Sequence, residues 1–196
     1  NQIIDSPQIN LKKANTPDEL IKNLKDNDWQ LRIFGGSTTN ENAYLQWRQK
    51  NTKGYDNINT CDGFGLTFKS ELSHSRFTSN LAKFLGSEDF FFKIIEKFKI
   101  PKSQFKIASG CHKYLNGYEL SPHFDSRNKL LTYMININPN PKSEYEKHHT
   151  HLMILKKKYK YISSYIKHNK DFDRPYLPWD WCSTVFKQTK NNSMII

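Results

Sequence analysis

Apolar positions spaced three and four residues apart predict helices in the first half of the chain. One begins at "NTPDEL", where Thr16 suits the N-cap, Pro17 suits the first helical position and Glu19 completes a capping box. Its apolar stripe consists of Leu20, Ile21 and Leu24. A second helix is predicted over "RFTSNLAKFLG", with its end at Gly86.

The segment "EDFFFKIIEKF" predicts a third helix. Ser87 precedes it and can cap its N-terminus, while Pro101 is expected to end it. Its apolar face consists of Phe91, Ile94, Ile95 and Phe98. By contrast, residues 28–65 are polar and rich in turn residues, with "FGG" and "CDGFG" as breakers, so this region is interpreted as turns.

From Phe105 onward the pattern changes to short apolar runs that are typical of strands. These runs are "FKIASGCHKYL", "LLTYMINI", "THLMILKK", "CSTVFKQ" and "NSMII". Asn116-Gly117 is a strong hairpin signal, and "QTKNNS" predicts that the last two runs also form a hairpin. The segment "KYKYISSYIKHNKDF" interrupts the series and fits either a helix or a lysine-rich excursion.

This order of elements predicts an α+β fold in a single domain over residues 1–196. Residues 1–104 form a mainly helical N-terminal part. Residues 105–196 form an antiparallel β system, interpreted as a double-stranded β-helix, or jelly roll, that lacks its last strands. The chain has no initial methionine and stops inside an apolar run, so it is expected to continue beyond both ends.

Charge and cysteine content narrow the interpretation. The net charge of +11 fits either an acidic partner, such as nucleic acid, or lysine-rich usage. Lysines are scattered, with one dense cluster at Lys156–Lys158 and Lys160, and the scatter favours lysine-rich usage. The three cysteines are odd in number and widely spaced, which predicts reduced thiols and a cytoplasmic location. No apolar run approaches the roughly 20 residues that cross a bilayer, so no membrane partner is expected.

The candidate chemistry lies at His123-Phe124-Asp125. Residues two apart on a strand point to the same face, so an imidazole nitrogen and a carboxylate oxygen can converge on one point. A histidine from a neighbouring strand would complete a two-histidine, one-carboxylate facial triad, which suits Fe(II) oxygen chemistry. The pair alone is a weak signal, and the alternative is an ordinary polar turn between strands. No phosphate-binding loop or nucleophile elbow competes with it.

The surroundings of this pair make the signal more specific. The segments "KIASGCHKY", "NG", "YELSPHFD", "SRNK" and "LLTYMININP" follow one another in this order. In this order they resemble the Fe(II)- and 2-oxoglutarate-dependent dioxygenases, the superfamily that includes the prolyl hydroxylases. The resemblance covers roughly residues 105–137 well and extends loosely to residue 196.

The resemblance implies an oxidoreductase that hydroxylates, or oxidatively demethylates, a substrate that the sequence does not identify. A protein or a small molecule is favoured over nucleic acid as that substrate. It implies Fe(II) and 2-oxoglutarate as cofactors, with ascorbate as an optional third. His123 and Asp125 would be iron ligands, and Tyr114, nine positions before the histidine, would bind 2-oxoglutarate or else fill the barrel. The third ligand histidine and a basic residue for the far carboxylate of 2-oxoglutarate are expected beyond Ile196. The resemblance does not define the oligomeric state.

Three other interpretations remain open. One is a non-catalytic jelly-roll binding module, and another is a nucleic-acid-binding protein, suggested by the net charge. The third is a cupin-like metal protein that uses His149 and His151 of "HHTH". The lone histidines are expected at the surface; they are His74, His112 and His168. Thr132 and Asn136 share strand parity and could line the same cavity, and "PYLPWDW" fits a packed loop better than a substrate-binding patch.

Overall fold

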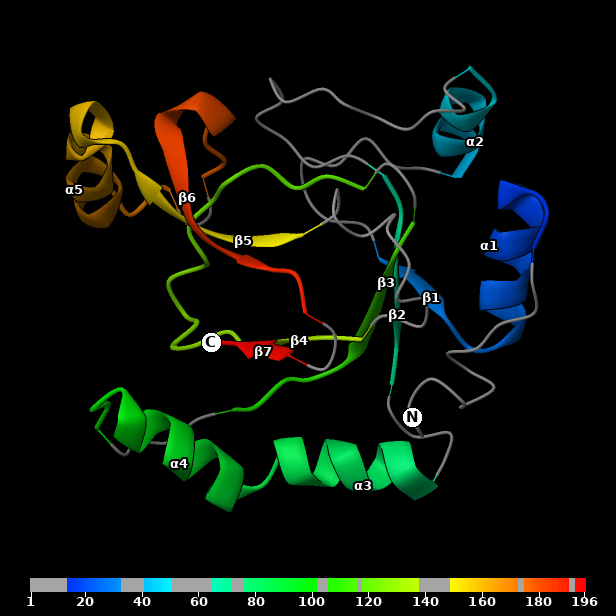
Figure 1. Cartoon of the computed structure of the whole chain (residues 1–196), viewed down its shortest axis with the longest axis horizontal. Coiled ribbons are helices and arrows are strands. Elements are labelled where there is room, and N and C mark those ends of the chain that lie inside the picture. Colours follow the sequence, from blue (N-terminus) through cyan, green and yellow to red (C-terminus); the bar gives the residue numbers. More distant parts are fainter. Residues whose placement is uncertain are drawn as a thin grey trace. The chain divides into compact units, whose positions relative to one another are not determined.

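The computed structural model describes residues 14–32, 41–50, 65–71, 76–101, 106–115, 118–137, 149–172, 175–190 and 193–196. The chain is a mixed α+β protein with small antiparallel sheets, as Figure 1 shows. It divides into two compact units, Asn1–Ile33 with Leu66–Leu115 and Phe34–Gly65 with Asn116–Ile196. The α+β prediction is therefore confirmed, and among the described strands no sheet closes on itself.

The first unit combines three helices with a three-stranded sheet. Its helices are α1 (Pro17–Asp26), α3 (Arg76–Leu85) and α4 (Glu88–Lys97). Its strands are β1 (Gln30–Arg32), β2 (Thr67–Ser70) and β3 (Cys111–Tyr114). The order β1-β2-β3 is antiparallel throughout, so β2 is the central strand. Leu66, Thr67, Phe68 and Ser70 are almost fully buried, which means that β2 is covered on both faces.

The predicted helix starts are confirmed at two of these helices. At α1, the Thr16 hydroxyl accepts a hydrogen bond from the Glu19 amide at 3.2 Å, and the Glu19 carboxylate accepts one from the Asn15 amide at 2.8 Å. At α4, the Ser87 hydroxyl accepts a bond from the Phe90 amide at 3.2 Å. Side-chain acceptors of this kind satisfy amides that have no partner within the helix.

The helix ends follow the sequence less closely. α3 ends at Leu85, directly before the predicted Gly86. The predicted end of α4 at Pro101 is wrong, because the helix already ends at Lys97 and Lys99 takes a left-handed φ of 54°. Ile94 and Ile95 of the predicted apolar face are buried, whereas Phe98, beyond the last turn, is 44% exposed.

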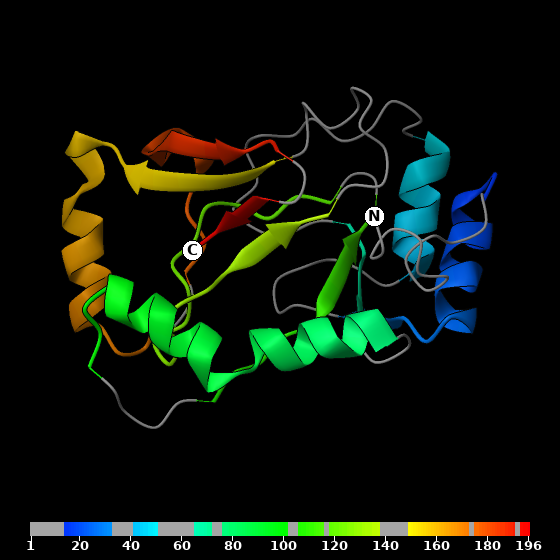
Figure 2. The same cartoon turned by 60° about the horizontal axis from the view of Figure 1, so that its bottom comes forward.

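The second unit contains two separate strand pairs and two helices. Its strands are β4 (Met134–Asn136), β5 (Thr150–Leu155), β6 (Cys182–Gln188) and β7 (Ser193–Ile195), and its helices are α2 (Glu41–Lys50) and α5 (Tyr161–His168). The segment between β5 and β6 begins with one 3₁₀ turn, Lys157–Tyr159, and ends with another, Trp179–Trp181. β5 pairs with β6 and β4 pairs with β7, both antiparallel, and Figure 2 shows the two pairs as distinct ribbons.

This pairing corrects one prediction. "QTKNNS" was expected to join β6 and β7 as a hairpin, but the strands have different partners. Instead, the side-chain amide of Gln188, at the end of β6, donates to the backbone carbonyls of Met134 and Ser193, at 3.1 and 2.8 Å. Gln188 thereby links the two strand pairs. The other predicted hairpin turn, Asn116-Gly117, lies outside the described residues.

The segment between β5 and β6 contains a helix, which settles the alternative left open by its sequence. The core of this part consists of Ile162, Leu177 and Cys182, and the side chains packed against it are Phe124, Met153, Leu155, Tyr159, Ile166 and Trp181. α5 contributes Ile162 and Ile166, one turn apart, while Met153 and Leu155 of β5 and Cys182 at the start of β6 contribute from the strands. α5 stands beside the end of the β5–β6 pair where β5 ends and β6 begins (Figure 1).

Candidate functional site

The backbone at His123 is held by a short antiparallel contact. His123 forms a β-bridge with Tyr176, and the Leu177 amide donates to the Pro122 carbonyl at 2.7 Å. The rings of His123 and Tyr176 meet edge to face, with their centroids 5.6 Å apart. This contact fixes the direction in which the His123 side chain leaves the strand.

Phe124 separates the two candidate ligands and faces the core. It packs against the cluster of Ile162, Leu177 and Cys182. Alternation along an extended backbone would place His123 and Asp125 on the side opposite Phe124, and this placement stays a prediction. The charge of His123 also acts on the Asp125 carboxyl. The two groups therefore lie near each other, while the shared face itself stays a prediction.

The His123 ring has a defined tautomer. Its Nδ1 lies 2.8 Å from the Ser121 carbonyl oxygen. A carbonyl oxygen only accepts hydrogen bonds, so Nδ1 carries the proton and donates. The lone pair of the neutral ring is therefore on Nε2. Histidines that bind metals are commonly oriented in this way, by a hydrogen bond from the other ring nitrogen.

The Asp125 carboxylate is engaged at both oxygens. Oδ1 accepts from the Lys129 ammonium at 2.9 Å, and Oδ2 accepts from the Thr132 hydroxyl at 2.5 Å. Partial burial raises the pKa of Asp125, but the hydrogen bonds from Thr132 and Lys129 and the charges of Lys129 and His123 outweigh it. The pKa of Asp125 therefore lies below its ordinary value, and the group is a carboxylate at neutral pH.

Arg127, in the turn that follows Asp125, ties this loop to the end of α5. Its guanidinium donates to four backbone carbonyls, those of Ile166, Lys167, Asn169 and Phe172. The distances to Lys167 and Asn169 are 3.2 and 2.5 Å. The last carbonyls of a helix have no partner within the helix, and a cation there is favoured by the helix dipole. Arg127 is therefore a C-terminal cap supplied from another part of the chain.

Replacing Arg127 with alanine is expected to loosen the last turn of α5 and to cost about 1–2 kcal/mol of stability, because several charge-assisted hydrogen bonds to carbonyls are lost. Hydrogen exchange of the α5 amides and a denaturant titration measure both effects. Arg127→Lys is the matched control. It keeps the charge but not the planar fork of donors, so partial recovery is expected. If the α5 amides exchange at the same rate in Arg127→Ala as in the unaltered protein, Arg127 does not stabilise the end of α5.

Tyr114, the predicted 2-oxoglutarate residue, lies on β3 in the first unit, whereas His123 and Asp125 lie in the second. Its side chain is 46% exposed, on the same sheet face as His112, and the two ring centroids are 6.2 Å apart. The cofactor role of Tyr114 stays a prediction.

The histidines of β5 have other partners. His151 Nδ1 lies 2.9 Å from the Thr184 hydroxyl, and its ring meets Trp179 edge to face at 5.8 Å. Burial, followed by the charges of Lys187 and His149, lowers the pKa of His151. The indole of Trp179 in turn donates to the Glu119 carboxylate at 2.7 Å. His148 lies outside the described residues.

No group of three or more His, Cys, Asp or Glu side chains within the described ranges could hold a metal ion. The cupin-like set of two histidines and a glutamate is thus not gathered in this part of the chain. His123 and Asp125 are a pair of donors, and the described residues do not supply a third beside them.

Several other predicted positions can now be placed. Trp181 stacks on Tyr159 at 4.8 Å and joins the core cluster, which supports packing for its segment. His112 and His168 are exposed, as expected, while His74 lies outside the described residues. Cys111 and His112 occupy opposite faces of β3.

Sequence reasoning missed most of the residues around the pair. Thr132 was considered as a cavity residue, but its bond to Asp125 was not predicted. Asn136, its companion, instead donates to the Lys190 carbonyl at 3.3 Å. The i,i+4 spacing of Asp125 and Lys129 could have indicated their ion pair, whereas Arg127 contacts carbonyls 39 to 45 positions away and carries no local signal.

Comparison of the chain with models of known protein families, with curated proteins and with solved structures gave no match. Among the described helices, none has the length and apolar character that a bilayer crossing requires.

Proposed function

We propose that the chain is an Fe(II)- and 2-oxoglutarate-dependent dioxygenase in which His123 and Asp125 are two of the iron ligands. The observation that carries this proposal is an imidazole and a carboxylate two residues apart, on either side of the core residue Phe124 and close enough that the charge of His123 acts on Asp125. Substrates of this class are hydroxylated or oxidatively demethylated. A protein or a small molecule is the proposed substrate, and Tyr114 is the proposed contact for 2-oxoglutarate.

The strand pairing supports a jelly roll as the framework of this site. The β5–β6 pair is nested within the β4–β7 pair along the chain, and the two pairs belong to different sheets. Jelly rolls are built in this way, because each successive hairpin contributes strands to two facing sheets. The bonds from Gln188 to both β4 and β7 hold the two pairs together.

The donor chemistry of the pair fits iron. Neutral imidazole nitrogen and carboxylate oxygen are two of the three protein ligands of the facial triad. The bond from His123 to Ser121 leaves the lone pair on Nε2, and the low pKa of Asp125 keeps the carboxylate charged. Thr132 orients Oδ2, while Lys129, on a long flexible side chain, can release Oδ1. When bound, Fe(II) with 2-oxoglutarate supplies the activation of molecular oxygen.

The test is an anaerobic titration of the protein with Fe(II) and then 2-oxoglutarate. A visible charge-transfer band is expected only when both are present, because the keto acid chelates the metal. Glutarate, which lacks the keto group, is the control and is expected to give no band. Absence of the band at saturating concentrations of both cofactors would contradict the proposal.

One observation favours a second candidate, a non-catalytic binding module. Both oxygens of Asp125 are already satisfied by Lys129 and Thr132, which is the arrangement of a structural carboxylate. In that case the protein binds neither Fe(II) nor 2-oxoglutarate, and the same titration separates the two candidates.

A further inference from the structure

The solvent-exposed side chains of α5 and of the turn before it are rich in lysine and tyrosine. We call this set the lysine–tyrosine face, and it consists of Lys157, Lys158, Lys160, Tyr161, Tyr165 and Lys167. All six of these residues are exposed. The inward side of the same helix carries Ile162 and Ile166, which pack on the core. The helix therefore has its apolar contact already, and this face is what it presents to solvent.

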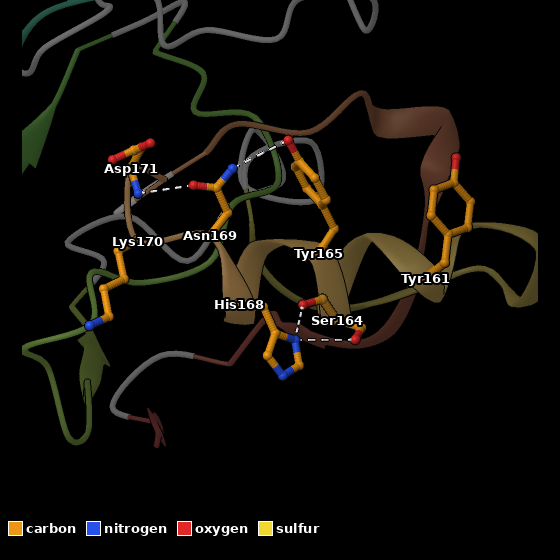
Figure 3. Close-up of a pocket in the computed structure, with 7 residues that line it drawn as sticks. All are labelled: Tyr161, Ser164, Tyr165, His168, Asn169, Lys170 and Asp171. Atoms are coloured by element: carbon orange, nitrogen blue, oxygen red, sulfur yellow. Dashed lines mark hydrogen bonds between the residues drawn. The ribbon is translucent and has the colours of Figure 1, made fainter.

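Two tyrosine rings stand out from this helix. Tyr161 is 66% exposed and Tyr165 is 58% exposed. They are four residues apart, so they are neighbours on one side of the helix, and Figure 3 shows both rising from the same side of α5. They line a surface pocket of about 620 Å³ together with Ser164, His168 and three residues of the following turn. Exposed aromatic rings beside an open pocket offer flat surfaces on which a planar ligand can stack.

The charge of this region is strongly positive. Residues 156–172 contain six lysines and one aspartate, a formal net charge of +5, out of +11 for the chain. Lys156 donates to the Asp180 carbonyl at 2.6 Å, and Lys158 lies 4.6 Å from the centre of the Tyr159 ring. Within the described residues, none of the six lysines forms an ion pair with a carboxylate. Among the described residues, the positive charge of this segment therefore exceeds the negative charge and can attract an anionic partner.

The combination of stacking rings and uncompensated lysines fits one kind of partner best. Single-stranded nucleic acids are bound by aromatic side chains that stack on bases and by lysines that contact phosphates. An anionic membrane would need large apolar side chains on the outward face, but the isoleucines of α5 point to the core. The other residues of α5 that line the pocket, Ser164 and His168, are polar.

We propose that the lysine–tyrosine face of α5 binds single-stranded nucleic acid, with Tyr161 and Tyr165 stacking on bases and the lysines contacting phosphates. The scatter of lysines along the sequence favours lysine-rich usage for the chain as a whole, but it does not account for exposed tyrosines at helical spacing among them. The proposal does not depend on the oxygenase function.

The experiment measures binding of a fluorescent 15-nucleotide deoxythymidine strand by anisotropy over a range of salt concentrations. Tyr161→Ala with Tyr165→Ala is expected to weaken binding by about 30-fold or more, since stacking contributes about 1–3 kcal/mol per base. Tyr161→Phe with Tyr165→Phe keeps both rings and is expected to bind normally. Full binding by the alanine pair, or no binding by the unaltered protein at low salt, would overturn the proposal.

A second set of variants tests the charges. Replacing Lys157, Lys160 and Lys167 with glutamine is expected to reduce the slope of log affinity against log salt by about 2, at about 0.7 per phosphate contact. The matched control removes three exposed lysines elsewhere, Lys22 and Lys25 of α1 and Lys93 of α4. Equal weakening in the control set would show a general charge effect and overturn the proposal. Heparin that competes as well as a nucleic acid strand, or anionic vesicles that bind in preference to it, would also overturn it.

Discussion

Replacing His123 with alanine is expected to lower the affinity for Fe(II) by more than about 100-fold. Removing a residue that only supports a metal ligand through a hydrogen bond lowers metal affinity by about 10–100-fold. Removing a ligand itself is therefore expected to lower the affinity further. The ring is held for this role by its bond to Ser121, with the lone pair on Nε2. Asp125→Ala is expected to have a similar effect, because it removes the charged donor. Anaerobic competition against a coloured chelator measures both affinities.

The control for this prediction is the double variant His149→Ala with His151→Ala. These histidines belong to the β5 region and have their own partners, so Fe(II) binding is expected to persist without them. If His123→Ala binds Fe(II) normally while the double variant does not, the metal site belongs to β5 and the proposed ligands are wrong.

Phe68→Ala is expected to destabilise the first unit by about 3–5 kcal/mol, the usual cost of removing a large buried aromatic side chain. Phe68 has no exposed surface and lies on β2, which is paired on both edges. The cavity would therefore open in the middle of the sheet, where neighbouring strands cannot easily close it. Equilibrium unfolding in urea, followed by circular dichroism, measures the loss.

Thr67→Val is the matched control on the same strand. Thr67 is 1% exposed, and its buried hydroxyl oxygen has no hydrogen-bond partner among the residues that the structure describes. Valine has nearly the same shape and removes this unsatisfied group, so stability is expected to stay the same or to rise by about 1 kcal/mol. A similar loss in both variants would indicate that any change in β2 disrupts the unit, and the packing argument for Phe68 would be wrong.

The sequence predicts those elements whose signals are local. Thr16 and Ser87 mark helix starts through their own side chains, and the apolar runs of β5, β6 and β7 coincide with the observed strands. By contrast, β2 has only four residues and is buried on both faces, so it lacks the alternation that identifies a strand. α2 was missed as well, in a region interpreted as turns.

Strand partners and the surroundings of the site could not be predicted in this way. The turn between β6 and β7 permits a hairpin, but hydrogen bonds formed with distant strands decide the pairing. A shared side for His123 and Asp125 is what strand geometry predicts, and it stays a prediction. The anchoring of Arg127 on α5 was not, because its acceptors become neighbours only after the chain has folded.

The anchor at Arg127 has a mechanical consequence. One rigid guanidinium holds several carbonyls at the end of α5 while its backbone follows Asp125 by two residues. A ligand that shifted the backbone at Asp125 would therefore strain the bonds between Arg127 and the end of α5. The loop that carries Asp125 is thus linked to the end of α5 through one side chain, although some forty residues of chain separate them.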